Sequence, residues 1–244
     1  MPDAIIQPRR GRNSPQLGPV AVLAAADPDV RLLRAALGFS SDEGRPLHIS
    51  RMYTASDRHP GLCLAGPMVG APYAVMLAES LIAWGARQIL FLGWCGAVSK
   101  PVEIGDVVLP TSALIDEGTS RHYLPDIRES TPSALLVEQL SAIGASDGLV
   151  IRKGPVWTTD APFRETRDKV LACQSRGVLA VEMEASGLFS LGAFRCADVA
   201  ALLVASDDLS DLSWRAGFKD PRFARGREAA CHILDTLCAK LTNP

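Results

Sequence analysis

Acidic residues in two segments of the second half of the chain are the first candidates for chemistry. Residues 181–185 read Val-Glu-Met-Glu-Ala, and an apolar run over residues 199–205 ends in Ser206 and Asp207. A carboxylate can accept hydrogen bonds from the neighbouring hydroxyls of a sugar, and a carboxylic acid held in a pocket can protonate a leaving group. The two segments therefore predict a site that holds a sugar and protonates the group that leaves it.

Cleavage of a ribosyl C–N bond passes through a sugar with oxocarbenium character, and these segments fit its requirements. Asp207 is the candidate acid for the departing base, and Ser206 could orient it. Glu184 is the candidate acceptor of the sugar hydroxyls, and Met183 could pack against the sugar face. Structural roles stay open: an Asp after a strand is typical of a turn or helix N-cap, and a helix dipole favours acids such as Glu182 and Glu184 at its start.

Composition bounds the class of protein. The 244 residues are 48% hydrophobic and carry a formal net charge of −2. This length and composition favour a single domain with one substantial core. The near-neutral net charge does not indicate a basic surface that would bind nucleic acid or an anionic membrane. No apolar run is long enough to span a bilayer. Neither nucleic acid nor a membrane is therefore expected as a partner.

The six cysteines are scattered along the chain, with no Cys-x-x-Cys pair and no histidine at ligand spacing. This pattern is typical of a reduced cytoplasmic protein with mostly buried thiols and predicts no metal site. The cysteines are Cys63, Cys95, Cys173, Cys196, Cys231 and Cys238.

Residues 1–18 differ in character from the rest of the chain. They contain Arg9, Arg10 and Arg12 and three prolines, but no apolar h-region. The segment therefore reads as a flexible polar leader and not as a signal peptide. Residues 19–244 are expected to form a single domain.

Strand and helix patterns alternate along this domain. The alternation predicts an α/β protein built as one sandwich around a mixed sheet. Apolar strands are expected at residues 20–24, 62–65, 89–92, 106–109, 149–152, 178–181 and 199–205. Helical spacing is expected at residues 30–37, 72–84, 134–143, 164–173, 183–194 and 224–241.

The chemically suggestive residues follow the ends of the expected strands. They lie in residues 24–29, 93–96, 182–184 and 206–207. Ligands collect at the carboxyl ends of the strands in open α/β sheets. We therefore expect the four segments to converge on one site.

Residues 93–98 read Gly-Trp-Cys-Gly-Ala-Val. Together with the Val-Glu-Met-Glu-Ala string and the following Ser206-Asp207, this segment resembles the nucleoside phosphorylase family, which also contains nucleosidases such as methylthioadenosine nucleosidase. The resemblance extends over residues 20–241. It implies a three-layer α/β/α sandwich around a mixed central β-sheet, a purine or modified nucleoside as substrate, and a homodimer or a hexamer built as a trimer of dimers.

The resemblance also implies roles for individual residues. Glu184 matches the glutamate that binds the ribose hydroxyls, Met183 the methionine beside the sugar, and Asp207 the acid that faces the base. Phe163 resembles the aromatic residue that stacks on the base. The residues expected to bind the substrate are Glu184, Met183, Glu182, Phe163, Trp94, Gly96 and Val69.

The positions that hold phosphate in the family's phosphorylases are altered here. The family loop Gly-Asp-Pro-x-Arg reads Ala-Asp-Pro-Asp-Val-Arg at residues 26–31. Phe91 stands at the position of a strand arginine, and Trp94 at the position of a serine. A dianion needs several donors and positive charge, whereas phenylalanine offers neither and tryptophan offers a single N–H.

Asp29 falls where the nucleosidases carry the glutamate that activates water, although it also fits as an acid in the first turn of a helix. The sequence therefore favours hydrolysis of the N-glycosidic bond, with Asp207, Asp29 and Ser206 as catalytic residues and no cofactor. Two alternatives stay open. One is a phosphorylase that uses phosphate as co-substrate, and the other is a nucleoside-binding protein without catalysis.

Overall fold

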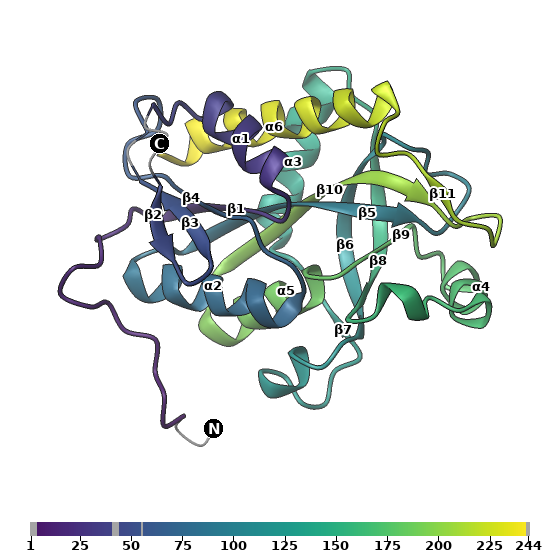
Figure 1. Cartoon of the computed structure of the whole chain (residues 1–244), viewed down its shortest axis with the longest axis horizontal. Helices are drawn as coiled ribbons and strands as arrows, with labels where there is room; N and C mark the ends of the chain where they lie inside the picture. The colour runs from purple at the N-terminus through teal and green to yellow at the C-terminus, as the bar shows by residue number, and fades with distance from the viewer. Residues whose placement is uncertain (1–3, 41–43, 55, 243–244) are drawn as a thin grey trace.

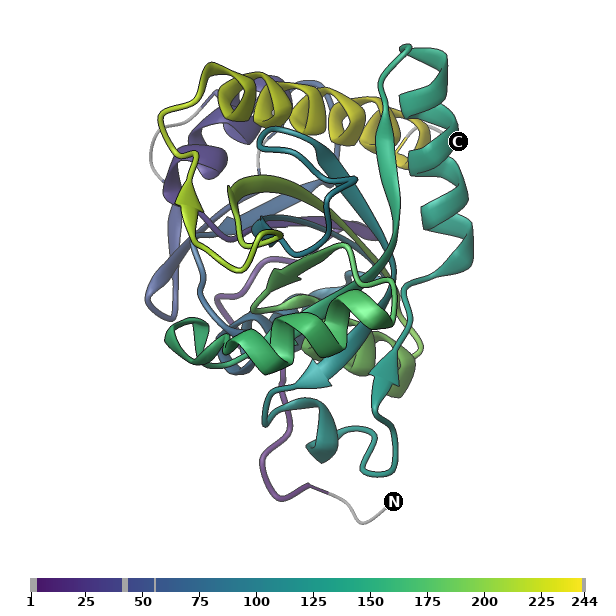
Figure 2. The ribbon, with the colours of Figure 1, turned by 90° about the vertical axis from the view of Figure 1, so that its right-hand side faces the viewer.

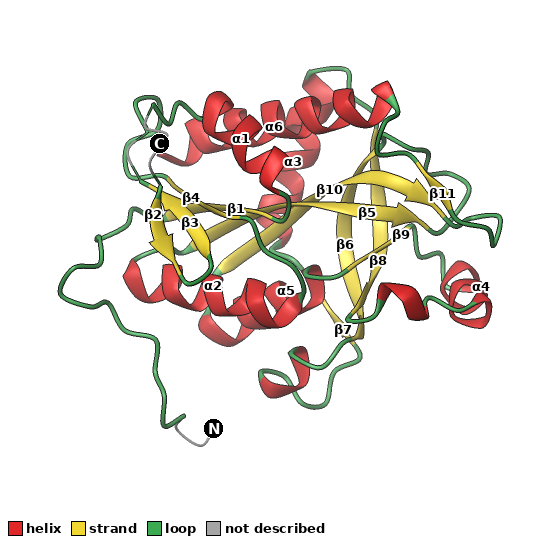
Figure 3. Ribbon diagram, viewed as in Figure 1, coloured by secondary structure: helices red, strands yellow, loops and turns green. Residues whose placement is uncertain are grey.

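The computed structural model describes residues 4–40, 44–54 and 56–242, and its strands form one mixed sheet (Figures 1 and 3). The parallel strands β4, β1, β5 and β10 lie next to one another in that order, and β3 and β2 extend the sheet beyond β4 in antiparallel fashion. The strands are β1 (Val20–Ala24), β2 (Arg45–Leu47), β3 (Ser50–Tyr53), β4 (Cys63–Gly66), β5 (Gln88–Ala97), β6 (Val107–Asp116), β7 (Glu129–Ser130), β8 (Ile151–Thr159), β9 (Ala180–Glu182), β10 (Asp198–Asp208) and β11 (Arg215–Ala216).

The other half of the sheet closes on itself. β10 pairs with β5 on one side and with β6 on the other, β6 pairs with β8, β8 with β9, and β9 returns to β5. Viewed from the side, these strands surround a common interior (Figure 2). The closure places β5, β9 and β10, which are far apart in the sequence, beside one another.

Helices cover both faces of the sheet, which confirms the expected three-layer α/β/α sandwich (Figure 1). α1 (Asp27–Ala36), α3 (Ala134–Ser146) and α6 (Pro221–Thr242) lie on one face, and α2 (Ala71–Trp84) and α5 (Ala185–Arg195) lie on the other. α4 (Arg167–Ser175) packs beside the closed half of the sheet. None of the helices in the described ranges is long and apolar enough to cross a membrane.

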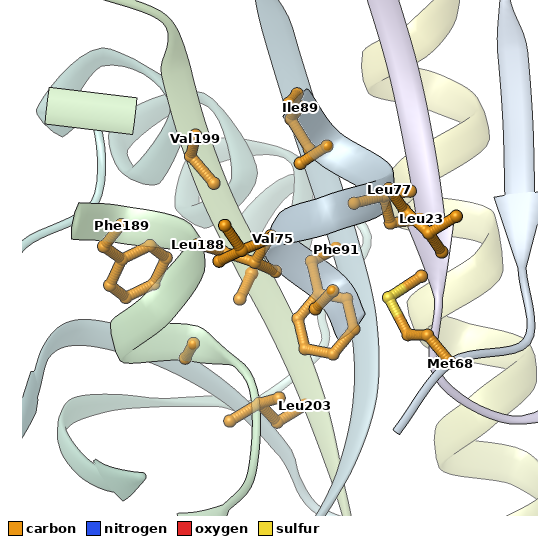
Figure 4. Packing of buried hydrophobic residues seen from close by; sticks show 14 of the residues in the cluster. Leu23, Met68, Val75, Leu77, Ile89, Phe91, Leu188, Phe189, Val199 and Leu203 are labelled. Carbon is orange, nitrogen blue, oxygen red and sulfur yellow. The ribbon is translucent and has the colours of Figure 1, made fainter. Parts of the chain in front are cut away.

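The burial of β1 shows why its sequence is apolar throughout. Val20 and Val22 belong to the cluster that packs under α1, α3 and α6, whereas Ala21 and Leu23 belong to the cluster under α2 and α5. A strand covered on both faces has no polar side, so its residues need not alternate in polarity. Figure 4 shows the second cluster, in which Phe91 of β5 is fully buried.

The observed strands differ from the expected ones mainly in length. β5 continues to Ala97 and β10 to Asp208, well past the expected ends at residues 92 and 205. Trp94, Gly96 and Asp207 therefore lie within strands and not in loops after them. Four short strands, β2, β3, β7 and β11, were not expected, because each is only two to four residues long.

α6 approaches the sheet closely at a glycine. A Cβ atom on Gly226 would lie 2.2 Å from the carbonyl oxygen of Gly105, so a larger residue would push the helix away. The close approach brings Phe223 and Arg227 of α6 against Trp94 of β5, with the Phe223 and Trp94 ring centroids 5.0 Å apart. The last helix thereby contributes to the surroundings of the strand ends.

Candidate active site

One cavity of about 710 Å³ lies at the carboxyl ends of several strands. Its walls come from the segments after β1 and β4, from the ends of β5 and β10, from the β9–α5 junction, and from the segment after β8. All four segments expected to converge contribute to it. Of the ten residues predicted to form the site, nine line the cavity: Val69, Trp94, Gly96, Phe163, Glu182, Met183, Glu184, Ser206 and Asp207.

Asp207 is aimed into the cavity by an irregularity in β10. The pairing of β10 with β5 shifts between Ala205 and Asp207, which leaves Ser206 as an extra residue, and such bulges redirect side chains. The Ser206 hydroxyl donates to Oδ1 of Asp207 at 2.7 Å, and the indole Nε1 of Trp214 donates to Oδ2 at 2.9 Å. A Cβ atom on Gly96 would lie 3.0 Å from Oδ2, so the glycine leaves room for this carboxylate.

Glu184 lies at the N-terminus of α5 and is almost completely buried. The backbone N–H of Gly70 donates to its Oε1 at 2.6 Å. Burial, and then the negative charge of Glu182, raise the pKa of Glu184 above the usual value. The Glu184 carboxyl group lines the cavity, so it is placed to accept a hydrogen bond from a ligand hydroxyl.

Glu182 is also buried, but both of its oxygens are occupied. Oε1 accepts a hydrogen bond from the Thr158 hydroxyl, and Oε2 accepts from the backbone N–H groups of Glu184 and Ala185, each at 2.7 Å. These two N–H groups are among the donors that a helix start leaves without partners. Glu182 thus fixes the start of α5 and the backbone of Glu184.

Asp29 is the one predicted site residue that does not line the cavity. It is fully buried, Trp94 Nε1 donates to its Oδ2 at 2.6 Å, and Arg227 Nε donates to its Oδ1 at 2.5 Å. Burial raises its pKa, although Arg227 and Trp94 oppose the rise. Both oxygens of Asp29 are thus engaged by other side chains, and its role as a base stays a prediction.

The aromatic residues of the predicted site lie at different depths. Phe91 points into the buried core and does not line the cavity (Figure 4). Trp94 is half-buried and forms part of the cavity wall. Phe163, in the short 3₁₀ helix Pro162–Arg164, is fully exposed at the rim. Trp214 and Phe218 also line the cavity, and the Phe218 ring centroid is 6.0 Å from that of Trp94.

Sequence reasoning missed two charged residues of this region. Glu165 lines the cavity just after the 3₁₀ helix, and burial followed by the charge of Asp207 raises its pKa to about 7. Arg227 is the partner of Asp29 and lies 198 positions later in the chain. Its place in α6, four positions after the buried Phe223, was the only signal that it faces inward.

The ionisable side chains that line the cavity are mostly carboxyl groups. Its described lining residues include the acids Glu165, Glu182, Glu184 and Asp207, and none of these lining residues is Arg, Lys or His. In the described ranges, no group of three or more His, Cys, Asp and Glu side chains is arranged to hold a metal ion. The site is therefore suited to a ligand that presents hydrogen-bond donors.

The Thr158 hydroxyl is expected to stabilise the junction of β8, β9 and α5. It donates to Glu182 and accepts from the Ser186 backbone N–H at 3.0 Å. Thr158→Val keeps the shape and leaves both groups unsatisfied in a buried place, which should lower the free energy of unfolding by about 1–3 kcal/mol. Thermal unfolding of Thr158→Val beside the exposed Thr131→Val measures the effect. Equal melting temperatures for the two variants would contradict it.

Comparison with known proteins identifies the family. Residues 19–239 match the phosphorylase superfamily. The purine nucleoside phosphorylases of DeoD type from Clostridium novyi and Bacillus cytotoxicus are 29% and 31% identical to the chain over 159 and 160 residues, which are 64% of this chain and 68% of each relative.

Solved structures share the fold at lower identity. Purine nucleoside phosphorylase from Toxoplasma gondii in complex with immucillin-H has a TM-score of 0.84 at 19% identity, covering 99% of this chain and 98% of that one. Uridine phosphorylase from Vibrio fischeri complexed with 6-hydroxy-1-naphthoic acid has a TM-score of 0.79 at 20% identity, covering 91% and 92%. On the sequence match over nearly its whole length, the chain belongs to the phosphorylase superfamily.

Proposed function

We propose that the protein cleaves the N-glycosidic bond of a nucleoside. The observation that carries the proposal is that Glu184 and Asp207, from separate segments of the chain, line the same cavity. One carboxyl group can hold the ribose while the other protonates the departing base. The names of the relatives, which are nucleoside phosphorylases, support the same reaction class.

Glu184 is suited to bind the ribose through its vicinal hydroxyls. One of its oxygens is fixed by the Gly70 N–H, so the carboxyl group is held in one orientation. Sugar hydroxyls that donate to it favour its charged form. A carboxylate so placed raises the electron density of the sugar and stabilises the positive charge that develops as the C–N bond breaks.

Asp207 is suited to protonate the base. A purine leaves more readily as a neutral molecule, and N7, in the five-membered ring that carries the glycosidic bond, is a nitrogen that can take the proton. The Ser206 hydroxyl and the Trp214 indole hold the Asp207 carboxyl group in place from both sides. Positioning of this kind is what general acid catalysis requires.

Two observations bear on the acceptor of the ribosyl group, and they point in opposite directions. The relatives and neighbours named above are all phosphorylases, which favours phosphate over the hydrolysis expected from the sequence. The acidic lining of the cavity, and the engagement of Arg227 by Asp29, favour water because a dianion finds no free positive charge there. We keep both acceptors as candidates, with the cleavage itself as the proposed function.

Base release from a panel of purine and pyrimidine nucleosides, with and without phosphate, distinguishes the acceptors. Ribose 1-phosphate as product and strict dependence on phosphate would establish phosphorolysis, whereas free ribose in the absence of phosphate would establish hydrolysis. Ligand-dependent thermal stabilisation with no base release from any nucleoside would overturn the proposed function and leave a binding protein.

Asp207→Asn should abolish protonation of the base and reduce kcat/KM for natural nucleosides by about 10²–10⁴-fold. A p-nitrophenyl riboside needs no proton on its leaving group, so its cleavage should fall by less than about 10-fold. Asp208→Asn is the matched control, because Asp208 pairs with Arg215 and does not line the cavity. Equal losses on both substrates would contradict the acid role.

Glu184→Gln should lower the activity and, at alkaline pH, raise the stability of the protein. Because burial raises the pKa of Glu184, the folded protein binds a proton more tightly than the unfolded chain, and stability is lost as pH rises above the ordinary value of 4.5. Gln cannot ionise and still accepts the Gly70 N–H. The variant should melt higher than the wild type at about pH 8, with little difference at about pH 5, while kcat/KM falls about 10- to 100-fold. An unchanged kcat/KM would refute the sugar-binding role.

A further inference from the structure

Glu165 is a carboxyl group in the cavity that the proposed mechanism does not use. It lines the wall beside Pro162 and Phe163, and it is partly buried. The other three acids of the lining each accept at least one hydrogen bond from the protein. No hydrogen bond or ion pair within the described residues engages the Glu165 carboxyl group, so its oxygens are available to a ligand.

The place of Glu165 relates it to the base and not to the sugar. It lines the same cavity as Asp207 and lies two positions after Phe163, the residue expected to stack on the base, and the charge of Asp207 adds to the rise in its pKa. In the proposed reaction Asp207 faces N7 of a purine. The next group along the same edge of a purine is the substituent on C6, so a second carboxyl group beside Asp207 meets that substituent.

We propose that Glu165 selects the base by its 6-substituent and favours 6-aminopurine nucleosides over 6-oxopurine nucleosides. This inference rests on the proposed function. An ionised carboxylate can only accept hydrogen bonds. It accepts one from a 6-amino group and repels the oxygen of a 6-oxo group. A hydrogen bond to a charged group of this kind corresponds to a preference of about 10- to 100-fold in kcat/KM.

The preference should depend on pH. Burial, followed by the charge of Asp207, raises the pKa of Glu165 to about 7, so the group holds a proton below that pH and can then donate to a 6-oxo group. The charged groups that share the cavity with it are Asp207 of β10 and Glu182 and Glu184 of the β9–α5 junction. Arg164 and Arg167 flank it in the sequence but are exposed and do not line the cavity. The preference for a 6-amino group should therefore grow as pH rises through neutrality.

The test compares adenosine with inosine at about pH 6 and pH 8, with phosphate present so that either acceptor is supplied. Wild-type protein should prefer adenosine, and by a larger factor at the higher pH. Glu165→Gln presents one donor and one acceptor at every pH, so the ratio should approach one and lose its pH dependence; Glu165→Ala should also lose the preference. The control Asp168→Asn removes the same charge from an exposed position nearby and should keep the wild-type ratio.

The outcomes separate this inference from the proposed function. If both nucleosides are cleaved and the preference for adenosine survives in Glu165→Gln, the role of Glu165 is overturned and the proposed function stays intact. Cleavage of pyrimidine nucleosides alone would have the same two consequences. If no nucleoside is cleaved, the proposed function fails. The shift in melting temperature caused by adenine and by hypoxanthine then still tests Glu165. Adenine should stabilise the wild-type protein more than hypoxanthine does, and Glu165→Gln should lose this difference. The same difference in the wild type and in Glu165→Gln would overturn the inference.

Discussion

The geometry of the site depends on the hydrogen bonds that one buried carboxyl group, that of Glu182, accepts. Through Thr158 it is tied to β8, and through the N–H groups of Glu184 and Ala185 it is tied to the first turn of α5. The neighbouring Val181 pairs with Gly96 of β5, so the same short strand also closes the curved half of the sheet. Glu184, Gly96 and the β8 end are thereby held in a fixed relation, and Asp207 faces them from β10.

This arrangement concentrates carboxyl groups in a place from which water is partly excluded. Burial raises the pKa of both Glu182 and Glu184. The three donors of Glu182 oppose this rise, whereas the charge of Glu182 adds to the rise at Glu184. In the proposed function, a substrate that brings hydroxyl donors relieves the penalty on Glu184, so part of the cost of burying that acid is recovered only when the ligand binds.

The sequence predicted the fold and most of the cavity, for reasons that lie in particular residues. The run Val20–Ala24 is apolar because both faces of β1 are covered, and Gly85 follows the last residue of α2 with a positive φ, so both elements carried strong local signals. The extension of β5 and β10 carried none, because closure of the sheet and the bulge at Ser206 set their ends. Glu165 and Arg227 could not be placed, since their significance arises from residues far away in the sequence: the charge of Asp207 acts on Glu165, and Arg227 donates to Asp29.

The cluster of Asp29, Trp94 and Arg227 explains how the altered loop can be tolerated. A carboxylate buried beside the end of β1 would be strongly unfavourable alone, and Arg227 supplies the opposite charge while Trp94 supplies a neutral donor. Arg227 also stacks over the Trp94 ring, with its guanidinium carbon 5.6 Å from the centroid. The three side chains therefore satisfy one another, and removing any one of them leaves a buried polar group without its partner. In the proposed reaction, an incoming anion would have to compete with Asp29 for Arg227, so the choice between water and phosphate would depend on the strength of this internal ion pair.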